Sequence, residues 1–226
     1  MGNVVAAALA FVGTHFILSH PLRRPLVRAV GEKGFLGLYS LVAAVTLGWL
    51  ALAYRAAPLA PPLWPVGDVL WAIGTILMLG SAILFMGSLV RNPALPQAAA
   101  GSAPEARGVF AITRHPMMWG FAIWGVVHIL VFPDPSNIVL ALSIIVLALL
   151  GAYLQDRKKE ALQPEFWREW ERRTSYWPFA AIAAGRARVG KIGMHALAGG
   201  FVVWLAATWA HIPLAGWPAG IWRWIG

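Results

Sequence analysis

The sequence predicts an all-α, polytopic membrane protein with about six transmembrane helices and a cytoplasmic amphipathic helix. Three observations support this fold class. Of the 226 residues, 59% are hydrophobic and 12% are charged, a balance typical of a chain that lies in a bilayer. Apolar segments recur at close to the ~20 residues that a helix needs to cross the hydrocarbon. Basic residues gather in every second connection between these segments.

The apolar segments are interpreted as six membrane helices of a single membrane domain that covers residues 1–226. The N-terminus lacks the basic region of a signal peptide, so the first segment is expected to remain as a membrane helix. No internal repeat and no domain boundary is evident. In chain order, the expected helices occupy residues 3–20, 35–54, 67–90, 116–133, 136–154 and 192–212.

The connections indicate where these helices begin and end. Short, proline-rich links at 57–68 and 133–137 separate the second helix from the third and the fourth from the fifth. Pro116 begins the fourth helix, because a proline in the first turn loses no hydrogen bond. Residues 155–190 form the one substantial polar segment, and its stretch EALQPEFWREWERR is expected as an amphipathic helix at the cytoplasmic face. The tail from Pro213 is too short to span, and its tryptophans indicate an interfacial anchor.

The distribution of cations predicts the orientation in the membrane. The connections after the first, third and fifth segments hold 16 of the 18 Lys and Arg residues, whereas Arg55 and Arg223 lie on the other side. By the positive-inside rule the 16 face the cytoplasm and both termini lie outside it. We therefore expect a multi-pass protein of a cell inner membrane, in contact with the lipid bilayer. The basic run at 157–173 is interpreted as meeting anionic lipid head groups, not nucleic acid.

Composition also excludes several kinds of site. The chain has no cysteine, so disulfides, iron–sulfur clusters, thiolate-ligated haem and a cysteine nucleophile are ruled out. No Asp or Glu lies inside an apolar segment except Asp68, at the end of one. Proton-coupled transporters usually keep a carboxylate at membrane depth, so that class is disfavoured.

Two histidines lie inside the apolar segments and are the first candidates for chemistry. His15 is in the first segment and His128 is in the fourth, and an ionisable side chain at membrane depth indicates a functional site by default. Trp124 and Gly125 share a helix face with His128, which suits a haem packed flat beside an axial imidazole. A histidine hydrogen-bonded across helices is the alternative. His211 is an alternative partner for His128.

A polar entrance precedes the fourth helix. Arg114 and His115 stand directly before Pro116, at the mouth of a membrane helix, and are the candidate catalytic residues. We expect both to face a polar pocket lined by residues 155–178. Arg107 and Arg114 could bind a ligand's carboxylate or a haem propionate, or could act only as positive-inside anchors.

The motif at this entrance resembles known membrane families. RHPMMWG, at residues 114–120, is similar to the R-H-P-x-M-x-G motif of the NnrU family, in which a second histidine follows 13 residues after the first, as His128 follows His115. His15, a short way before a Leu-Arg pair, and the stretch GEKGFLGLYSLV also resemble that family. The 15-cis-ζ-carotene isomerase family looks like a relative, and the isoprenylcysteine carboxyl methyltransferase family looks like a more distant one.

The resemblance implies a cofactor and its ligands. The related isomerases carry haem b with two histidine ligands, and the positions that match these are His15 and His128. His115 matches the R-H-P histidine that the families share. Met118 replaces the tyrosine of the methyltransferase motif, which puts S-adenosylmethionine chemistry in doubt. NnrU proteins are associated with nitrogen-oxide metabolism, which implies a respiratory or denitrification complex as a partner.

Three functions follow from these observations. The leading one is a haem b-binding membrane protein of the NnrU type that acts on a lipophilic or small-molecule substrate, for example as an isomerase. The second is an S-adenosylmethionine-dependent membrane methyltransferase. The third is a non-enzymatic accessory factor of a respiratory complex. A Soret band favours the first, adenosylmethionine binding without colour the second, and co-purification with a respiratory enzyme without a cofactor the third.

The orientation is open to a direct test. A reporter fused after Gly226 is expected to be active only if it functions outside the cytoplasm, because the three basic connections stay inside. Parallel fusions of alkaline phosphatase and a fluorescent protein measure this, and fusions after Lys33 provide the control for the opposite side. Cytoplasmic activity of the fusion at Gly226 would contradict the six-helix topology.

Overall fold

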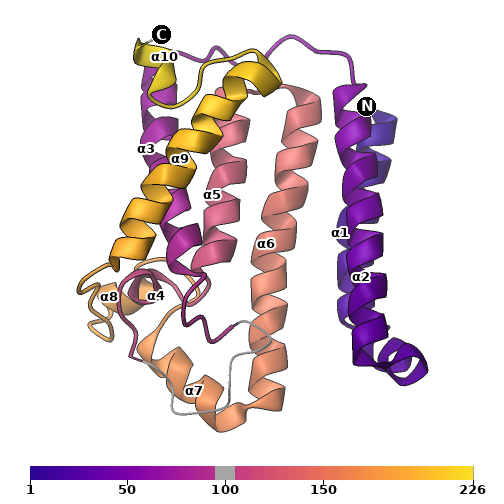
Figure 1. The fold of residues 1–226 in the computed structure, drawn as a ribbon, viewed down its shortest axis with the longest axis vertical. Coiled ribbons are helices and arrows are strands. Elements are labelled where there is room, and N and C mark those ends of the chain that lie inside the picture. The colour runs from indigo at the N-terminus through magenta and orange to yellow at the C-terminus, as the bar shows by residue number, and fades with distance from the viewer. Residues whose placement is uncertain (95–104, 226) are drawn as a thin grey trace.

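The computed structural model describes residues 1–94 and 105–225, and all regular structure within them is helical. Short helices lie at both ends of a bundle of longer ones (Figure 1). We call the end with α4, α7 and α8 the basic end; the N-terminus and α10 lie at the other end. The long helices are α1 (Gly2–Ser19), α2 (Arg23–Arg55), α3 (Asp68–Gly87), α5 (Pro116–Val131), α6 (Pro135–Leu162) and α9 (Met194–Ala215). The short ones are α4 (Val109–Ile112), α7 (Pro164–Arg173), α8 (Ala180–Ala183) and α10 (Trp222–Ile225).

Helix length supports a multi-pass membrane protein with five candidate spans in the described residues: α1, α2, α3, α6 and α9. The fourth expected segment forms α5, which is apolar but has only 16 residues and ends at Val131. Phe132 leaves the helical conformation at φ −142° and ψ 76°. Asn137 then closes the helix end, because its Nδ2 donates to the carbonyl oxygens of His128 (2.9 Å) and Phe132 (2.7 Å). Of the six expected segments, five thus form helices of spanning length in the described part of the chain, and the fourth forms a shorter apolar helix.

The helix expected over EALQPEFWREWERR is divided between two helices. α6 continues beyond its apolar part to Leu162. Gln163 then leaves helical geometry at φ −142° and ψ 61°, and Pro164 begins α7, because the residue before a proline disfavours the helical conformation. The prediction of one continuous helix was wrong at this point. The residues that α7 buries completely are Trp167 and Trp170.

α2 begins earlier than its apolar segment. The expected helix started at residue 35, whereas α2 starts at Arg23 and bends at Gly31, which has φ 74° and ψ 169°. Glycine adopts a positive φ readily, whereas a side chain would be strained there. The bend leaves Arg23, Arg24 and Arg28 in a separate short helical stretch, which lies at the basic end (Figure 1), and Lys33 follows the bend.

α6 joins the two parts of the bundle. It packs on one side against α1, which pairs with α2, and on the other side against α5, while α3 packs against both α5 and α9. Small and aliphatic side chains, with one phenylalanine, make the contact among α1, α2 and α6, as is common where lipid-embedded helices approach closely. The buried residues of this contact are Val4, Ala7, Ala8, Phe11, Leu50 and Ala53.

Glycines permit the closest helix contacts. A Cβ atom at Gly125 of α5 would lie 2.6 Å from Cγ1 of Ile145 and 3.0 Å from the carbonyl oxygen of Ala141, both in α6. A Cβ atom at Gly200 of α9 would lie 2.8 Å from the Cα of Ile83 in α3. These distances are too short for real atoms, so the helices approach this closely because no side chain intervenes.

The C-terminal tail folds back over the end opposite the basic end. Trp222 donates from Nε1 to Oγ1 of Thr208 in α9 at 3.2 Å. Arg223 pairs with Asp68 at the start of α3 (3.2 Å), and its guanidinium lies 4.8 Å from the centre of the Trp71 ring. The tail, which was expected as an aromatic anchor, thus also connects α9 to α3.

The contact at Gly125 can be tested with a matched pair of variants. Gly125→Ala is expected to destabilise the protein by about 1–3 kcal/mol, because the new methyl group must displace Ile145 and the α6 backbone. Gly80→Ala in α3 is the control, since a Cβ atom there meets nothing within 4 Å and replacing a helical glycine by alanine is favourable by up to about 1 kcal/mol. Thermal unfolding in detergent compares the two, and equal unfolding temperatures would contradict the close contact.

Candidate functional site

The segment before α5 is held in an extended conformation. Gly108, with φ 59°, turns the chain into α4, and Thr113 after it is extended and fully buried. Two bonds fix this segment to the chain that follows α7. The N–H of Arg114 donates to the carbonyl of Ser175 at 2.8 Å, and Oγ1 of Thr113 donates to the carbonyl of Tyr176 at 2.7 Å. The backbone that carries the next two side chains is therefore fixed.

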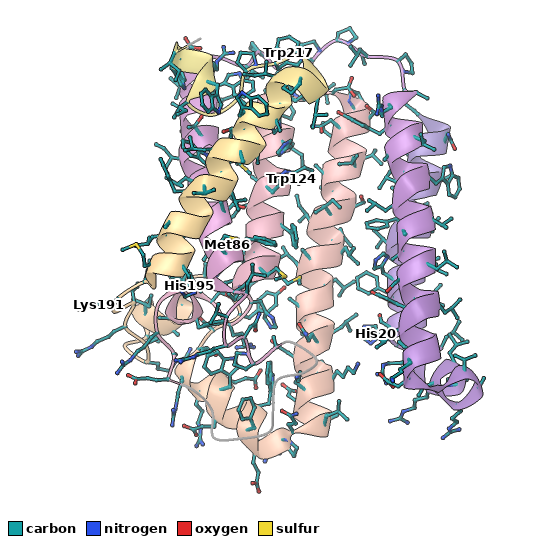
Figure 2. All side chains as sticks on the ribbon, viewed as in Figure 1. His20, Met86, Trp124, Lys191, His195 and Trp217 are labelled. Carbon is teal, nitrogen blue, oxygen red and sulfur yellow. The ribbon has the colours of Figure 1, made fainter. Side chains whose placement is uncertain are left out.

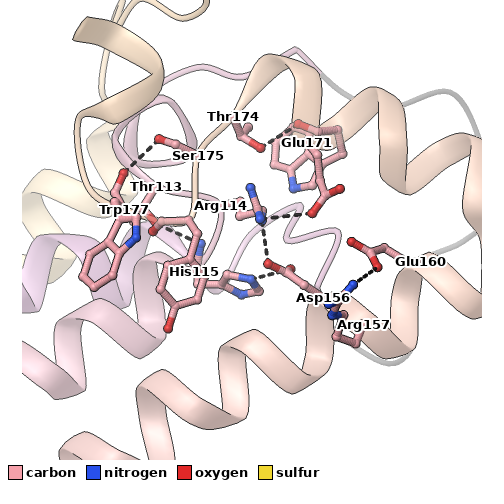
Figure 3. A network of polar contacts seen from close by, with 12 residues as sticks. Thr113, Arg114, His115, Asp156, Arg157, Glu160, Glu171, Thr174, Ser175 and Trp177 are labelled. Atoms are coloured by element: carbon pink, nitrogen blue, oxygen red, sulfur yellow. Dashed lines mark hydrogen bonds and ion pairs between the residues drawn. The ribbon is translucent and has the colours of Figure 1, made fainter. Parts of the chain in front are cut away.

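His115 is buried and bonded to a carboxylate that comes from α6. Its side chain is 1% exposed, and its Nε2 lies 2.6 Å from Oδ1 of Asp156. Because an ionised carboxylate only accepts hydrogen bonds, Nε2 carries the proton. His115 is also the residue that precedes Pro116 at the start of α5. The bond therefore joins the start of α5 to the end of α6 (Figure 3).

Arg114 completes a buried network of opposite charges. Its Nε donates to Oδ2 of Asp156 at 2.8 Å, and its Nη2 lies 3.0 Å from Oε1 of Glu171 in α7 (Figure 3). Charges that are removed from water need partners of this kind. A ligand's carboxylate or a haem propionate, considered for Arg114 from the sequence, would have to displace two carboxylates of the protein.

A cavity of about 650 Å³ opens beside this network. A polar pocket lined from residues 155–178 was expected here, and much of the lining comes from that segment. Arg114 lines the cavity, whereas His115 lies behind it, bonded to Asp156. The rest of the lining is apolar and aromatic. The charged lining residues are Arg114, Asp156, Arg157, Glu160 and Glu171.

Glu171 has a perturbed ionisation in this cavity. Burial raises the pKa of its carboxyl group, Arg114 opposes that rise, and the neighbouring carboxylates of Asp156 and Glu160 add to it. Glu171 therefore binds a proton more tightly than a glutamate in water does.

A second set of polar groups lies on α5 and α9. The Nδ1 of His128 donates to the carbonyl of Trp124 at 2.8 Å, and that of His211 donates to the carbonyl of Ala207 at 2.7 Å. A carbonyl only accepts, so Nδ1 carries the proton in each ring and Nε2 keeps a lone pair in the neutral imidazole. The centres of the two rings are 6.0 Å apart. The structure thus brings His128 together with His211.

His15 has the same local hydrogen bond in a different part of the bundle. Its Nδ1 donates to the carbonyl of Phe11 at 2.7 Å, and its ring packs edge-on against Phe11 and Tyr39 of α2. α6 packs against α1 on one side and α5 on the other (Figure 1). The ring contacts of His15 and of His128 have no residue in common, so this structure does not bring together the two ligands that the resemblance implies.

The other expected cofactor residues lie in three separate environments. The ring of Trp124, labelled in Figure 2, stacks on His128 with centres 4.0 Å apart and planes inclined by 30°. Gly125 faces α6 and not the stacked rings. The side chain of Arg107 is 70% exposed and pairs with Glu105 at 2.7 Å. Of these three residues, Trp124 alone contacts an intramembrane histidine.

Asp156, which binds both candidate catalytic residues, was not foreseen from the sequence. It lies 41 residues after His115, so no local motif connects the two. One signal was present: Asp156 follows the buried Ala152 by one helical turn and shares its face. The expected helix ended before that turn, and the buried face was not followed into the polar segment.

Comparisons with known proteins identify relatives of this chain. The family model described as NnrU protein matches residues 3–219. A 15-cis-zeta-carotene isomerase, chloroplastic, from Zea mays is 36% identical over 84 residues, 37% of this chain and 23% of that protein. The protein of the same description from Arabidopsis thaliana is 37% identical over 79 residues, 35% of this chain and 22% of that protein. The match thus spans less than a quarter of each relative, and no solved structure matches the chain.

The buried network predicts a large effect of one substitution. Asp156→Asn is expected to destabilise the protein by about 3–5 kcal/mol, because Arg114 and His115 would lose the charge that they share. The control is Asp68→Asn, which removes a 72% exposed carboxylate paired with Arg223 and should cost less than about 1 kcal/mol. Circular dichroism in detergent, followed with temperature, measures both. Indistinguishable transitions would mean that the network does not stabilise the fold.

Proposed function

This chain belongs to the NnrU family of membrane proteins, and we propose that it is a haem b-binding membrane isomerase with a lipophilic substrate. The proposal is carried by the state of His128. Its Nδ1–H is bonded to the carbonyl of Trp124, and its Nε2 has a free lone pair in the neutral ring. Histidine in this state is a common axial ligand of haem iron.

The side chains present fit a haem in their donor atoms and packing surfaces. A histidine that binds a metal almost always donates its second N–H to a nearby acceptor, which fixes the ring. His15, His128 and His211 all do so through the carbonyl one helical turn earlier. Trp124 adds a flat aromatic surface beside His128. When bound, haem b supplies redox chemistry at its iron.

His128 belongs to two candidate ligand pairs. The family resemblance pairs it with His15, and the distance of 6.0 Å between ring centres pairs it with His211. We therefore assign His128 as the constant ligand. The identity of the second ligand is an outcome of the experiment below.

Support for the reaction class comes from two relatives. The two similar proteins are described as isomerases of 15-cis-zeta-carotene. The matched segment covers about a third of this chain, so we carry over the class of reaction and not the substrate itself. A lipophilic substrate agrees with a protein whose long helices are apolar and suited to a bilayer.

A second candidate function is an S-adenosylmethionine-dependent methyltransferase. The cavity beside Arg114 favours it, because a charged wall and an apolar wall meet there. Such a site could hold a polar methyl donor next to a lipophilic acceptor. Met118, in place of the tyrosine of the methyltransferase motif, counts against this function.

Absorption spectra test the leading proposal. The purified protein should show a Soret band with low-spin, six-coordinate features in its oxidised and reduced states. His128→Ala should lose haem or become high-spin, because it removes the ligand common to both pairs. Whichever of His15→Ala and His211→Ala has the same effect identifies the second ligand. The controls are His20→Ala and His195→Ala, which change histidines nearer the basic end (Figure 2) and should leave the spectra unaltered.

Two outcomes would decide against this proposal. A Soret band that is unchanged in His128→Ala would reject the assigned ligand. A colourless protein that binds adenosylmethionine would instead support the methyltransferase.

A further inference from the structure

The charges around the cavity beside Arg114 do not balance. Its lining contains two arginines and three carboxylates. Arg114 is already bonded to Asp156 and Glu171, and Arg157 lies 3.5 Å from Glu160. With every group ionised, the lining carries one negative charge in excess.

The excess of carboxylates favours a positive group near Glu160 and Glu171, which both line the cavity. Burial and the neighbouring carboxylates of Asp156 and Glu160 raise the pKa of Glu171, so a positive group beside Glu160 and Glu171 would stabilise their ionised forms. An ammonium group carries one positive charge and up to three N–H donors. It could donate to both carboxylates at once.

The apolar part of the cavity lining is suited to an acyl chain. Leu150, Tyr153 and Trp177 line it and are 42%, 47% and 63% exposed. Along α6 the sequence changes from apolar at Leu150 to charged at Asp156 within two helical turns. The cavity therefore lies where the hydrocarbon of a bilayer gives way to its head groups.

The guanidinium of Arg157 lies at the mouth of the same cavity. Its side chain is 63% exposed, and its Cζ lies 5.6 Å from the centre of the Tyr153 ring. Arg157 pairs with Glu160, which lines the cavity. An ammonium that binds Glu160 would release this guanidinium to bind a lipid phosphate. The mouth thus offers a negative and a positive site side by side.

We propose that this cavity binds a phospholipid with a primary ammonium head group, taken from the bilayer. Its ammonium lies between Glu160 and Glu171, its phosphate faces Arg157, and one acyl chain runs along Leu150 and Trp177. The proposal does not depend on haem or on the isomerase function, because the cavity and the intramembrane histidines have no residue in common.

Lipid titration of the full-length protein in detergent, read by native mass spectrometry, tests this. Phosphatidylethanolamine should bind at least about tenfold more tightly than phosphatidylglycerol with the same chains, because a charged hydrogen bond is gained. Phosphatidylcholine has no N–H donor on its ammonium and should also bind more weakly. Water-soluble phosphoethanolamine should bind far more weakly, because it makes no contact with the apolar wall.

Three variants assign the binding to the cavity. The double variant Glu160→Gln, Glu171→Gln should reduce the preference for phosphatidylethanolamine about tenfold or more. The control Glu169→Gln lies on the same helix as Glu171 but pairs with Arg172 and Arg173, and it should keep the preference. Leu150→Trp fills the apolar half without changing a charge and should weaken binding of all three phospholipids.

Several results would overturn the proposal. Equal affinity for phosphatidylethanolamine and phosphatidylglycerol would remove the role of the ammonium. Equal affinity for phosphoethanolamine would remove the role of the acyl chain. If the double variant fails to fold, undiminished lipid binding by Leu150→Trp would still refute the site. Displacement of bound lipid by adenosylmethionine would assign the cavity to the methyl donor instead.

Discussion

The arrangement of the basic end depends on one carboxylate, that of Asp156. Its two oxygens are used separately, Oδ1 by His115 and Oδ2 by Arg114. Because these two residues immediately precede α5, the carboxylate fixes both the entry into that helix and the end of α6. Arg114 extends the same network to Glu171 in α7. Buried charges are tolerated only with partners, so the start of α5, the last turns of α6 and α7 are held in one geometry.

The cavity exists because α6 continues beyond its apolar residues. The helix continues to Leu162 and so carries Asp156 and Glu160 beyond the part suited to hydrocarbon. Pro164 then turns the chain into α7, which returns Glu171 to the same place. A helix that ended with its apolar segment would leave no charged wall. The polar and apolar halves of the cavity thus reflect the boundary between lipid and water that α6 crosses.

The intramembrane histidines satisfy a different constraint. Lipid offers no hydrogen-bond partner, so a ring N–H there must find one within the protein. His15, His128 and His211 each donate to the carbonyl one turn earlier in their own helix. Each of these hydrogen bonds is made within one helix and needs no neighbouring helix. It leaves the second ring nitrogen free to bind a ligand, and the packing of the helices decides which rings meet.

The sequence by itself determined the all-helical membrane class, most of the long helices and the position of Arg114 and His115 before α5, because apolar length and a proline at a helix start are local properties. Tertiary structure decided what those residues meet. The link to Asp156 spans 41 residues, and the meeting of His128 with His211 depends on how α9 and α5 are placed around α3. The break at Gln163 is an intermediate case. Pro164 indicated it locally, but the helical pattern of the sequence continued across it. Hydrophobic periodicity describes each helix separately. The burial of a charged pair and the shape of a cavity depend on how the helices pack against one another.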